Sequence, residues 1–455
     1  MNLNKCARGR IFFAVMDSRD IAISILRTLH AAGHEAWLVG GCVRDELRGV
    51  APKDYDLATD ARPGQVEALF PKTLGVGKSF GVMLVLEGGM QFEVATFRAE
   101  SGYSDGRRPD DVTFGDAKAD ALRRDFTING LFLNPITNEL RDWVAGEADL
   151  KAGVLRTIGD PTERFGEDHL RLLRAVRFAA QLDFQIELAT FAAVQEHAEK
   201  INHVSAERIR DELLKLFRPP HAARGLDLLR DSGLLAHVLP EMMHTIGCEQ
   251  SPEYHPEGDV YKHIRLMLDS MAEDAPAELP WTILLHDIAK PATASLGEDG
   301  RIHNYGHDKL GAEMAKVILE RLKFPRKQID EIIFTVREHM HLAAAPKMRK
   351  AKLRRILLRS TFELELEQHR IDCLGSHRNL DIYDFLRAEQ AALEGVPTLM
   401  KPLVTGRDLI ELGLKPGPPM GKLLNEIRDR QLAEEFSTRD EALAWVRDGK
   451  KKTAQ

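Results

Sequence analysis

The spacing of apolar residues changes repeatedly within the first 150 positions of the chain. Residues 18–32 repeat apolar side chains at helical intervals and predict an amphipathic helix. Residues 35–41 and 54–59 are short apolar runs typical of strands, and 42–49 between them has the spacing of a short helix. Residues 81–97 contain two β-type runs around a Gly-Gly pair, the pattern of a hairpin. An α+β domain with a small sheet is therefore predicted here.

From about residue 160 onward, helical spacing replaces the β-type pattern. The segments 167–182, 186–198, 206–217 and 224–236 are each predicted to be helical throughout. A polar loop at 251–259 separates them from a second helical block, and a Gly/Pro-rich loop follows at 414–421. We expect four domains, at residues 1–150, 151–250, 251–390 and 391–455.

The composition is that of a globular protein, since 44% of the 455 residues are apolar and 29% are charged. The net charge of −7 argues against a protein that binds nucleic acid over its whole surface. Arginines are nevertheless concentrated between residues 107 and 178, so a local basic track is expected there. Four isolated cysteines and a short apolar run at 11–16 indicate no disulfide framework, signal peptide or membrane span. We therefore expect a cytoplasmic protein with no membrane partner.

Asp54 and Asp56 are the first candidates for chemistry. They stand two apart in a predicted strand, so their carboxylates leave the same face. Paired carboxylates hold Mg²⁺ together with water and substrate phosphates, and Glu93 on the second hairpin strand is a candidate third ligand. A lone Asp-x-Asp is common and is usually not a metal site. The residues just upstream make this one more specific.

Gly40, Gly41 and Arg44 precede the two aspartates in the sequence. Glycines let backbone amides approach a triphosphate, and Arg44 with the start of a short helix adds positive potential. These three residues are therefore candidates for nucleotide binding.

Four segments within the first 190 residues carry a resemblance to a known family. They are LVGGCVRDELRGVAPKDYDLAT (38–59), FEVATFR (92–98), DALRRDFTINGLFLNP (120–135) and GEDHLRLLRAVRFAAQLDFQI (166–186). In this order they resemble the polymerase-β-like nucleotidyltransferases of the bacterial and eukaryotic class, which contains CCA-adding enzymes and bacterial poly(A) polymerases. The resemblance implies a small mixed-sheet head followed by an all-helical neck, body and tail.

The run Arg123-Arg124-Asp125 offers two cations for phosphate oxygens and an acceptor for ribose hydroxyls. Taken alone, such a charge run is more often a solvated helix start with ion pairs inside the helix. The resemblance implies ribose and phosphate recognition by Arg123, Arg124, Asp125 and Asn129.

Asp168 and Arg171 are three apart in a predicted helix and so share a face. Together they offer acceptors and donors that match the edge of a base. An ordinary salt bridge on a helix surface is the common alternative. The resemblance implies that this pair selects CTP and then ATP, with Arg174 and Arg177 orienting the pair or meeting RNA phosphate.

Two segments bear on which nucleotides are added. Residues 99–114 are polar and contain glycine, and they predict a mobile loop. In CCA-adding relatives a flexible loop at this place serves the change from C to A addition, so the resemblance favours CCA or A addition over CC addition. Residues 72–85 follow the glycine-containing pattern of the tRNA enzymes, which argues against a poly(A) polymerase. These motifs barely exclude an enzyme that adds only A.

The helical block between residues 259 and 380 contains a further constellation. An adjacent His-Asp pair on an apolar helix, with a histidine before it and an aspartate far downstream, resembles the HD superfamily of metal-dependent phosphohydrolases. Imidazole and carboxylate ligands suit Ni²⁺, Co²⁺, Mn²⁺ or Mg²⁺. Single histidines are more often caps, surface groups or core residues, and some HD relatives keep only the scaffold. The candidate ligands are His263, His286, Asp287 and Asp372, with His307 and His339 for a second ion.

The leading hypothesis is an enzyme that adds CCA to the 3′ end of tRNA from CTP and ATP, with Mg²⁺ held by Asp54 and Asp56. The alternatives are a poly(A) polymerase and an enzyme that adds A only. Hypotheses of another class are a phosphohydrolase acting on nucleotides or cyclic phosphates with a relic head, and an RNA-binding module without catalysis. The intact Asp-Tyr-Asp and Arg-Arg-Asp motifs argue against both. Nothing in the sequence indicates the oligomeric state.

Overall fold

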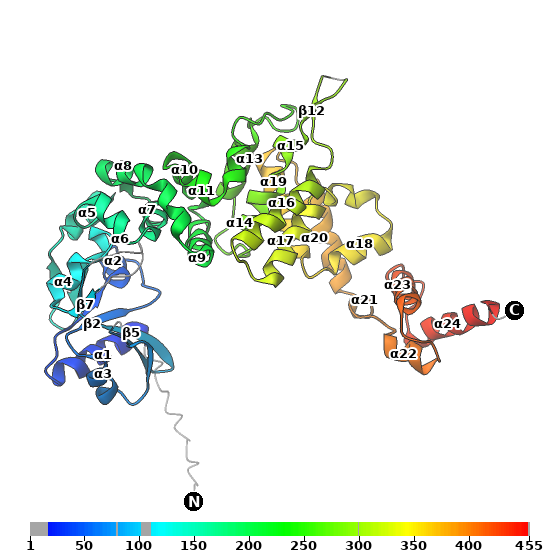
Figure 1. Ribbon diagram of the computed structural model, residues 1–455. Helices are drawn as coiled ribbons and strands as arrows, with labels where there is room; N and C mark the ends of the chain where they lie inside the picture. Colours follow the sequence, from blue (N-terminus) through cyan, green and yellow to red (C-terminus); the bar gives the residue numbers. More distant parts are fainter. Residues whose placement is uncertain (1–16, 79–80, 102–110, 299, 454–455) are drawn as a thin grey trace, which may run out of the picture. The chain divides into compact units, whose positions relative to one another are not determined.

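The computed structural model describes residues 17–78, 81–101, 111–298 and 300–453 (Figure 1). These residues fall into two compact units. The first contains the described chain up to Arg208 together with residues 231–237, and the second contains residues 209–230 and the chain from Val238 onward. The division lies inside the region 151–250, which we expected to be one domain.

The first unit contains a seven-stranded mixed sheet with the strand order β3-β4-β5-β2-β1-β8-β9. β2 and β5 are parallel neighbours, and the other neighbouring pairs are antiparallel. The mixed sheet that the sequence predicted is confirmed, and β1 is buried along its whole length because it lies inside the sheet. The strands are β1 (Ala36–Val39), β2 (Asp56–Thr59), β3 (Thr73–Gly77), β4 (Val82–Glu87), β5 (Met90–Thr96), β8 (Leu131–Asn134) and β9 (Glu139–Asp142).

The hairpin predicted at residues 81–97 is present as β4 and β5. Its turn is Gly88-Gly89, and both glycines have positive φ (59° and 79°), which residues with a Cβ disfavour. Side chains alternate along β5, so Phe92 and Val94 are buried while Glu93 between them is exposed. The hairpin thus holds the Glu93 carboxylate outside the core.

Helices complete the first unit, and α1 and α2 contact β1 of the sheet. α1 buries Ile21, Ile25 and Leu29 on one face, as its apolar spacing predicted. The helices are α1 (Ser18–Ala31), α2 (Gly41–Leu47), α3 (Pro63–Leu69), α4 (Ala117–Leu122), α5 (Gly146–Ala152), α6 (Pro161–Glu167), α7 (Leu170–Leu182) and α8 (Leu188–Glu196), with 3₁₀ turns η2 (Thr127–Asn129) and η3 (Ala198–His203). β10 (Val154–Leu155) and β11 (Gln185–Ile186) form a short parallel pair.

Several segments differ from the sequence prediction. Residues 186–198 are not helical throughout, because Ile186 belongs to β11, and residues 224–236 are interrupted at 232–234, where Gly233 has a φ of 78°. Residues 167–182 are not one helix, because Asp168 is extended (φ −139°, ψ 106°) between α6 and α7. The Asp168 side chain accepts the backbone N–H of Leu170, a local bond that competes with the helical one. The segment 99–114 is not all loop, because β6 (Arg98–Ser101) pairs with β7 (Asp111–Phe114). The mobile loop predicted between them, at 102–110 with Arg107 and Arg108, lies outside the described residues.

The second unit is built mainly of helices around an apolar core. Trp281 packs edge-on against Phe217 and Phe324, with ring centroids 5.8 and 4.7 Å apart. The segment 414–421, predicted as a loop, contains the start of α23 at Pro418, where the missing N–H of proline costs no helical bond. The helices from residue 206 onward, of which α11 lies almost wholly in the first unit, are α9 (Ala206–Leu216), α10 (Ala222–Asp231), α11 (Leu235–Val238), α12 (Pro240–Met243), α13 (Val260–Asp269), α14 (Leu279–His286), α15 (Lys290–Thr293), α16 (His307–Arg321), α17 (Arg326–Glu338), η4 (Leu342–Lys347), α18 (Lys350–Leu357), α19 (Phe362–Gly375), α20 (Asp381–Glu394), α21 (Pro397–Met400), α22 (Gly406–Glu411), α23 (Pro418–Leu432) and α24 (Arg439–Thr453), with β12 (Ser295–Leu296) and β13 (Ile302–His303) as a short antiparallel pair.

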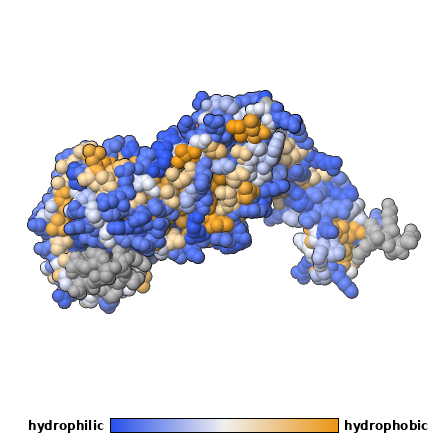
Figure 2. Space-filling view, turned by 45° about the horizontal axis from the view of Figure 1, so that its top comes forward, coloured by the Kyte–Doolittle hydropathy of each residue, from blue (hydrophilic) through white to orange (hydrophobic). Residues whose placement is uncertain are grey.

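The surface of the described residues is largely polar. Figure 2 shows hydrophilic residues over most of the visible face, with apolar residues gathered in smaller patches. None of the helices in the described ranges is long and apolar enough to cross a lipid bilayer.

Candidate active sites

Three carboxylates of the head lie on or beside two neighbouring strands. Asp56 is the first residue of β2, and Glu93 on the parallel strand β5 precedes Val94, the partner of Leu57. Asp54 lies before the strand and not in it, contrary to prediction, because β2 begins only at Asp56, which pairs with β1. Burial and the charges of Glu93 and Asp54 raise the pKa of Asp56 to about 6. A divalent cation would relieve this repulsion, so the three carboxylates fit a metal site.

Arg124 lies over the glycine turn at the start of α2. Gly40 has a φ of 75°, and a Cβ on it would come within 3.1 Å of Arg124 Nη1. Gly41 is the first residue of the helix. Arg44 is buried, and its guanidinium donates to both Asp45 carboxylate oxygens (2.9 and 3.0 Å) and to Asn129 Oδ1 (2.9 Å). Arg44 thus contacts protein groups, and its Nη2 would lie 3.6 Å from a Cβ on Gly41, so Arg44 and Arg124 both lie beside the glycine turn.

The carboxylate of Asp125 is the centre of a buried polar network. Arg174 donates to its Oδ2 from two nitrogens (2.9 and 2.6 Å), and Asn129 donates to its Oδ1 (3.0 Å). Burial opposes ionisation, but Arg174 and Asn129 outweigh it and hold the pKa of Asp125 well below its usual range. The network joins Arg44, Asn129, Asp125 and Arg174. These residues belong to separate sequence motifs, and each was predicted to bind nucleotide.

Arg123 and Arg124 both form ion pairs with Asp120, at 2.6 and 2.9 Å. The ion pairs that the sequence left open as an alternative are therefore present. Burial opposes ionisation of Asp120, but the two arginines outweigh it and lower its pKa. The Arg123 and Arg124 side chains remain 17% and 18% exposed, so Asp120 fixes their positions while leaving each a solvent-accessible part.

Asp168 and Arg171 do not pair with each other. Arg208 donates to both carboxylate oxygens of Asp168 (2.9 and 3.2 Å), and Arg171 donates to Glu167 (2.6 Å) and to the carbonyl of Arg123 (3.1 Å). The reason is the helix break at Asp168, which places the two residues on different elements. Both remain in the first unit, on either side of that break.

The other two arginines of α7 lie against Phe178. The guanidinium carbons of Arg174 and Arg177 are 5.2 and 3.9 Å from the centre of its ring, and Arg177 also donates to Gln181 (3.0 Å). Phe178 itself is buried. Arg174 therefore connects the ring to the Asp125 carboxylate.

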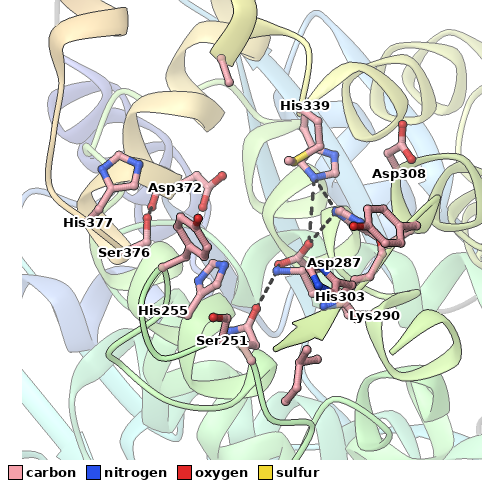
Figure 3. A pocket seen from close by; sticks show the side chains of 18 of the residues that line it. Ser251, His255, Asp287, Lys290, His303, Asp308, His339, Asp372, Ser376 and His377 are labelled. Carbon is pink, nitrogen blue, oxygen red and sulfur yellow. Dashed lines mark hydrogen bonds and ion pairs between the residues drawn. The ribbon is translucent and has the colours of Figure 1, made fainter. Parts of the chain in front are cut away.

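The second unit brings together all six histidine and aspartate candidates, which we call the histidine–aspartate cluster. Two groups of three ligand atoms each lie within 4.8 Å: His263, His286 and Asp372, and Asp287, His307 and His339. They come from α13, the end of α14, the start of α16, the end of α17, and α19. Figure 3 shows Asp287, His339 and Asp372 around one cavity. Among the described residues, groups this close occur only in the second unit.

The ring orientations in the cluster suit metal binding. Nδ1 of His286, His307 and His339 each donates to a backbone carbonyl, at 2.8, 2.6 and 2.6 Å, which leaves every Nε2 as a possible ligand. The buried Nε2 atoms of His263 and His286 face carboxylate oxygens of Asp372 and Asp287, at 3.2 and 3.1 Å. Burial and the neighbouring His286 lower the pKa of His339 to about 4, so this ring is neutral at physiological pH. A neutral imidazole is the form that binds a metal ion.

Glu257 is a part of this site that the sequence did not reveal. Its Oε1 accepts hydrogen bonds from Nδ1 of His263 (2.7 Å) and of His255 (2.9 Å). Burial opposes protonation of His263, but Asp372 and Glu257 outweigh it and raise the pKa of His263 to about 9, so a metal ion must displace a proton. The segment 251–259 was interpreted only as a separating loop; its signal is a His-x-Glu six residues before His263.

Comparison with known proteins gives three family matches along the chain. Residues 36–156 match a model described as "Poly A polymerase head domain". Residues 183–245 match "Probable RNA and SrmB- binding site of polymerase A", and residues 308–446 match "tRNA nucleotidyltransferase domain 2". The first match contains the three head carboxylates, the glycine turn and Arg44, Asp125 and Asn129 of the Asp125 network, whereas Arg174 lies outside it.

Similarity to individual proteins extends over nearly the whole length. The CCA-adding enzyme of Levilactobacillus brevis is 32% identical over 412 residues, 90% of this chain and 92% of that protein. The CCA-adding enzyme of Streptococcus mutans is 32% identical over 431 residues, 93% of this chain and 95% of that protein. The crystal structure of the Bacillus stearothermophilus CCA-adding enzyme in complex with CTP is 27% identical, with a TM-score of 0.71, and covers 96% of this chain and 100% of that chain. This chain therefore belongs to the family of CCA-adding enzymes, the tRNA nucleotidyltransferases.

Proposed function

We propose that this chain adds CCA to the 3′ end of tRNA, taking CTP and ATP and releasing pyrophosphate. The observation that carries the proposal at the level of residues is the group of Asp54, Asp56 and Glu93, in which burial and the two neighbouring carboxylates raise the pKa of Asp56. The 3′-hydroxyl of the RNA forms a bond to the α-phosphate, and the bond to pyrophosphate breaks. A divalent ion held by Asp54 and Asp56, Mg²⁺ in this proposal, supplies neutralisation of charge at the transferring phosphate. We further propose that the chain acts in the cytoplasm.

We assign nucleotide orientation to the residues around the glycine turn. Arg124, held by Asp120 beside Gly40, is placed to meet triphosphate oxygens, with Arg123 next to it. The ionised Asp125 holds Arg174 and Asn129 in fixed positions, and we assign recognition of the ribose to this network. Fixed donors of this kind need no rearrangement during the reaction, which is how positioning lowers a barrier.

We assign base selection to Asp168 and Arg171. This role requires that Asp168 exchange Arg208, and Arg171 exchange Glu167, for the edge of a base. In the absence of a nucleotide, Arg208 pairs with Asp168 and Glu167 pairs with Arg171, so neither Asp168 nor Arg171 is left without a hydrogen-bond partner.

Replacing Arg171 with alanine is expected to reduce the preference for CTP over UTP by about ten- to a hundredfold, because a paired donor contributes roughly 1–3 kcal/mol of discrimination. The measurement is kcat/KM for each nucleotide on a tRNA transcript ending at the discriminator base. Arg27→Ala, an exposed arginine on α1, is the matched control. Unchanged discrimination would remove Arg171 from this role.

One experiment tests the proposed activity directly. The purified chain is incubated with tRNA transcripts ending at the discriminator base, at C and at CC, with CTP and ATP separately and together, and the products are sequenced. Addition that completes CCA and stops supports the proposal. A long A tail identifies a poly(A) polymerase, and addition of A to the CC transcript alone identifies an enzyme that adds A only.

A second candidate function is carried by the histidine–aspartate cluster. We propose that it holds one or two divalent ions, such as Ni²⁺, Co²⁺, Mn²⁺ or Mg²⁺, and hydrolyses phosphate esters of nucleotides, including cyclic ones. The supporting observation is that the Nε2 atoms of His263, His286 and His307 lie beside carboxylate oxygens of Asp372 and Asp287, at 3.2, 3.1 and 3.5 Å, within two groups of possible metal ligands. In such hydrolysis a water oxygen forms a bond to phosphorus, one ester bond breaks, and the alcohol leaves with a proton. Lys290 Nζ lies 2.7 Å from Asp287 Oδ2 and places a positive charge beside that carboxylate.

Glu257→Gln is expected to weaken metal binding by the cluster about ten- to a hundredfold, the usual effect of losing a carboxylate that orients a ligating histidine. The measurement is isothermal titration of the metal-free chain with Mn²⁺ and Co²⁺. Glu253→Gln, in the same loop but paired with the exposed Arg301, is the control. Equal affinity of the Glu257 variant and the unaltered chain would show that Glu257 has no orienting role.

A further inference from the structure

The cavity that contains the histidine–aspartate cluster is larger than a metal site requires. Its volume is about 560 Å³, within the range of sites for small organic ligands (roughly 300–1,000 Å³). Four residues of the cluster line it, and Tyr254, His303 and Tyr305 line it as well. Figure 3 shows His303 near Asp287 and Lys290 in this cavity. The cavity therefore combines polar metal ligands with aromatic rings.

The aromatic rings are placed for contact with a ligand. Tyr305 is 79% exposed and Tyr254 is 53% exposed, and in the described part of the chain they are the two exposed tyrosines. Both line this one cavity. An exposed aromatic ring keeps a large apolar face in water, which a flat ligand would cover favourably.

Tyr305 is also held in a defined orientation. Its ring is stacked on that of His303, with centroids 5.1 Å apart and planes inclined by only 7°. One face of the tyrosine is thus covered by the imidazole, and its high exposure leaves area for a second planar group. Stacking of this kind is how proteins hold nucleobases without regard to their hydrogen-bonding edges.

Tyr305 lies close in the chain to one of the metal ligands. Tyr305 is two residues before His307, and consecutive Cα atoms are about 3.8 Å apart, so the two Cα atoms lie within about 7.6 Å. In a nucleoside phosphate, a single ribose separates the phosphate from the base. Because Tyr305 and four residues of the cluster line the same cavity, a phosphate at the cluster and a base at Tyr305 would occupy one cavity.

We propose that the cavity binds a nucleoside phosphate, with the phosphate at the histidine–aspartate cluster and the base stacked on Tyr305, which His303 supports from behind. The proposal rests on the hydrolytic function proposed for the cluster and names its substrate class and a residue that determines specificity. The same chemistry is presented by a free mononucleotide and by the 3′-phosphorylated end of an RNA.

The test measures binding to the full, Mn²⁺-loaded chain by equilibrium dialysis. The ligands are the phosphonate analogue of AMP, whose methylene bridge resists hydrolysis, and the corresponding ribose phosphonate without a base. Binding is counted at this site only where Asp287→Asn removes it, which excludes nucleotide bound by the head. Tyr305→Ala is expected to weaken binding of the AMP analogue about tenfold and that of the ribose phosphonate less than twofold, whereas Tyr305→Phe keeps the affinity for both.

Each outcome decides a different part of the proposal. Equal weakening of both ligands by Tyr305→Ala, or no weakening of either, overturns the base contact while the hydrolytic function stands. Absence of any Asp287-dependent binding overturns both. A parallel measurement with a short RNA bearing a 3′-phosphate or a 3′-hydroxyl distinguishes the two sources, since an RNA ligand requires Tyr305-dependent binding of the phosphorylated form.

Discussion

Asp56→Asn is expected to lower nucleotide addition by at least about a thousandfold. Asparagine keeps the size of the side chain but loses the charge that holds a divalent ion beside Glu93 and Asp54. A metal ion at a phosphoryl centre contributes several kcal/mol of charge stabilisation, and each 1.4 kcal/mol is about tenfold in rate. The measurement is single-turnover transfer from labelled CTP to a tRNA transcript that ends at the discriminator base.

The same substitution is expected not to destabilise the chain, which separates catalysis from folding. The folded state raises the pKa of Asp56 to about 6 from 3.8, so it binds the proton more tightly than the unfolded state. In metal-free protein, ionisation of Asp56 therefore lowers the free energy of unfolding as the pH rises from about 4 to about 6, and asparagine removes this loss. Glu87→Gln, an exposed carboxylate at the end of β4, is the matched control. Activity of Asp56→Asn within tenfold of the control would contradict the metal role.

Asp287→Asn is expected to abolish phosphate ester hydrolysis by the cluster, with a loss of at least about a thousandfold, and to leave nucleotide addition unchanged. Asp287 contributes its carboxylate to one of the two ligand groups. Burial opposes ionisation of Asp287, but His286 and Lys290 outweigh it and hold the pKa of Asp287 well below its usual range. The neutral amide offers neither the charge nor the second oxygen that a divalent ion requires. The measurement is hydrolysis of 2′,3′-cyclic nucleotides with Ni²⁺, Co²⁺, Mn²⁺ or Mg²⁺.

Two controls distinguish a lost metal site from a misfolded domain. Asp308→Asn changes an aspartate that lines the same cavity but belongs to neither ligand group, and it is expected to keep full hydrolysis (Figure 3). The removed charge leaves Lys290 buried without its ionic partner, so the thermal unfolding of the variant is measured alongside. Hydrolysis that persists in a folded Asp287→Asn variant would exclude the cluster as the site.

The helices and strands that are marked by local spacing were predictable from the sequence. The hairpin at 81–97 and the helix at 18–32 have their expected places, because their apolar periods and turn glycines act within a few residues. The spacing of apolar residues gave a wrong prediction where one polar side chain interrupts the helical backbone. Asp168 lies in the middle of an apolar helical pattern, yet its bond to the N–H of Leu170 ends one helix and begins the next.

The candidate sites depend more strongly on contacts between distant residues. Arg44 and Asn129 are 85 residues apart and share a hydrogen bond that no local pattern indicates. Glu257 was missed for the same reason, because a loop glutamate gains its role only when the fold brings it against His263. The pairing of Asp168 with Arg208 and of Arg171 with Glu167 likewise replaced the pair expected from their spacing.

The sequence by itself determined the family resemblance, the α+β head followed by helices, and the residue types of both candidate sites. The head motifs are short runs of neighbouring residues, and the histidines and aspartates of the second site are marked by residue type, so both can be recognised without the fold. Only the tertiary structure decided which side chains meet: that Asp120 holds Arg123 and Arg124, and that residues between 257 and 372 form one cluster with a cavity beside Tyr305. Side chains from distant parts of the sequence meet because whole helices pack against a shared core. The periodic pattern along one helix does not specify which helices become its neighbours.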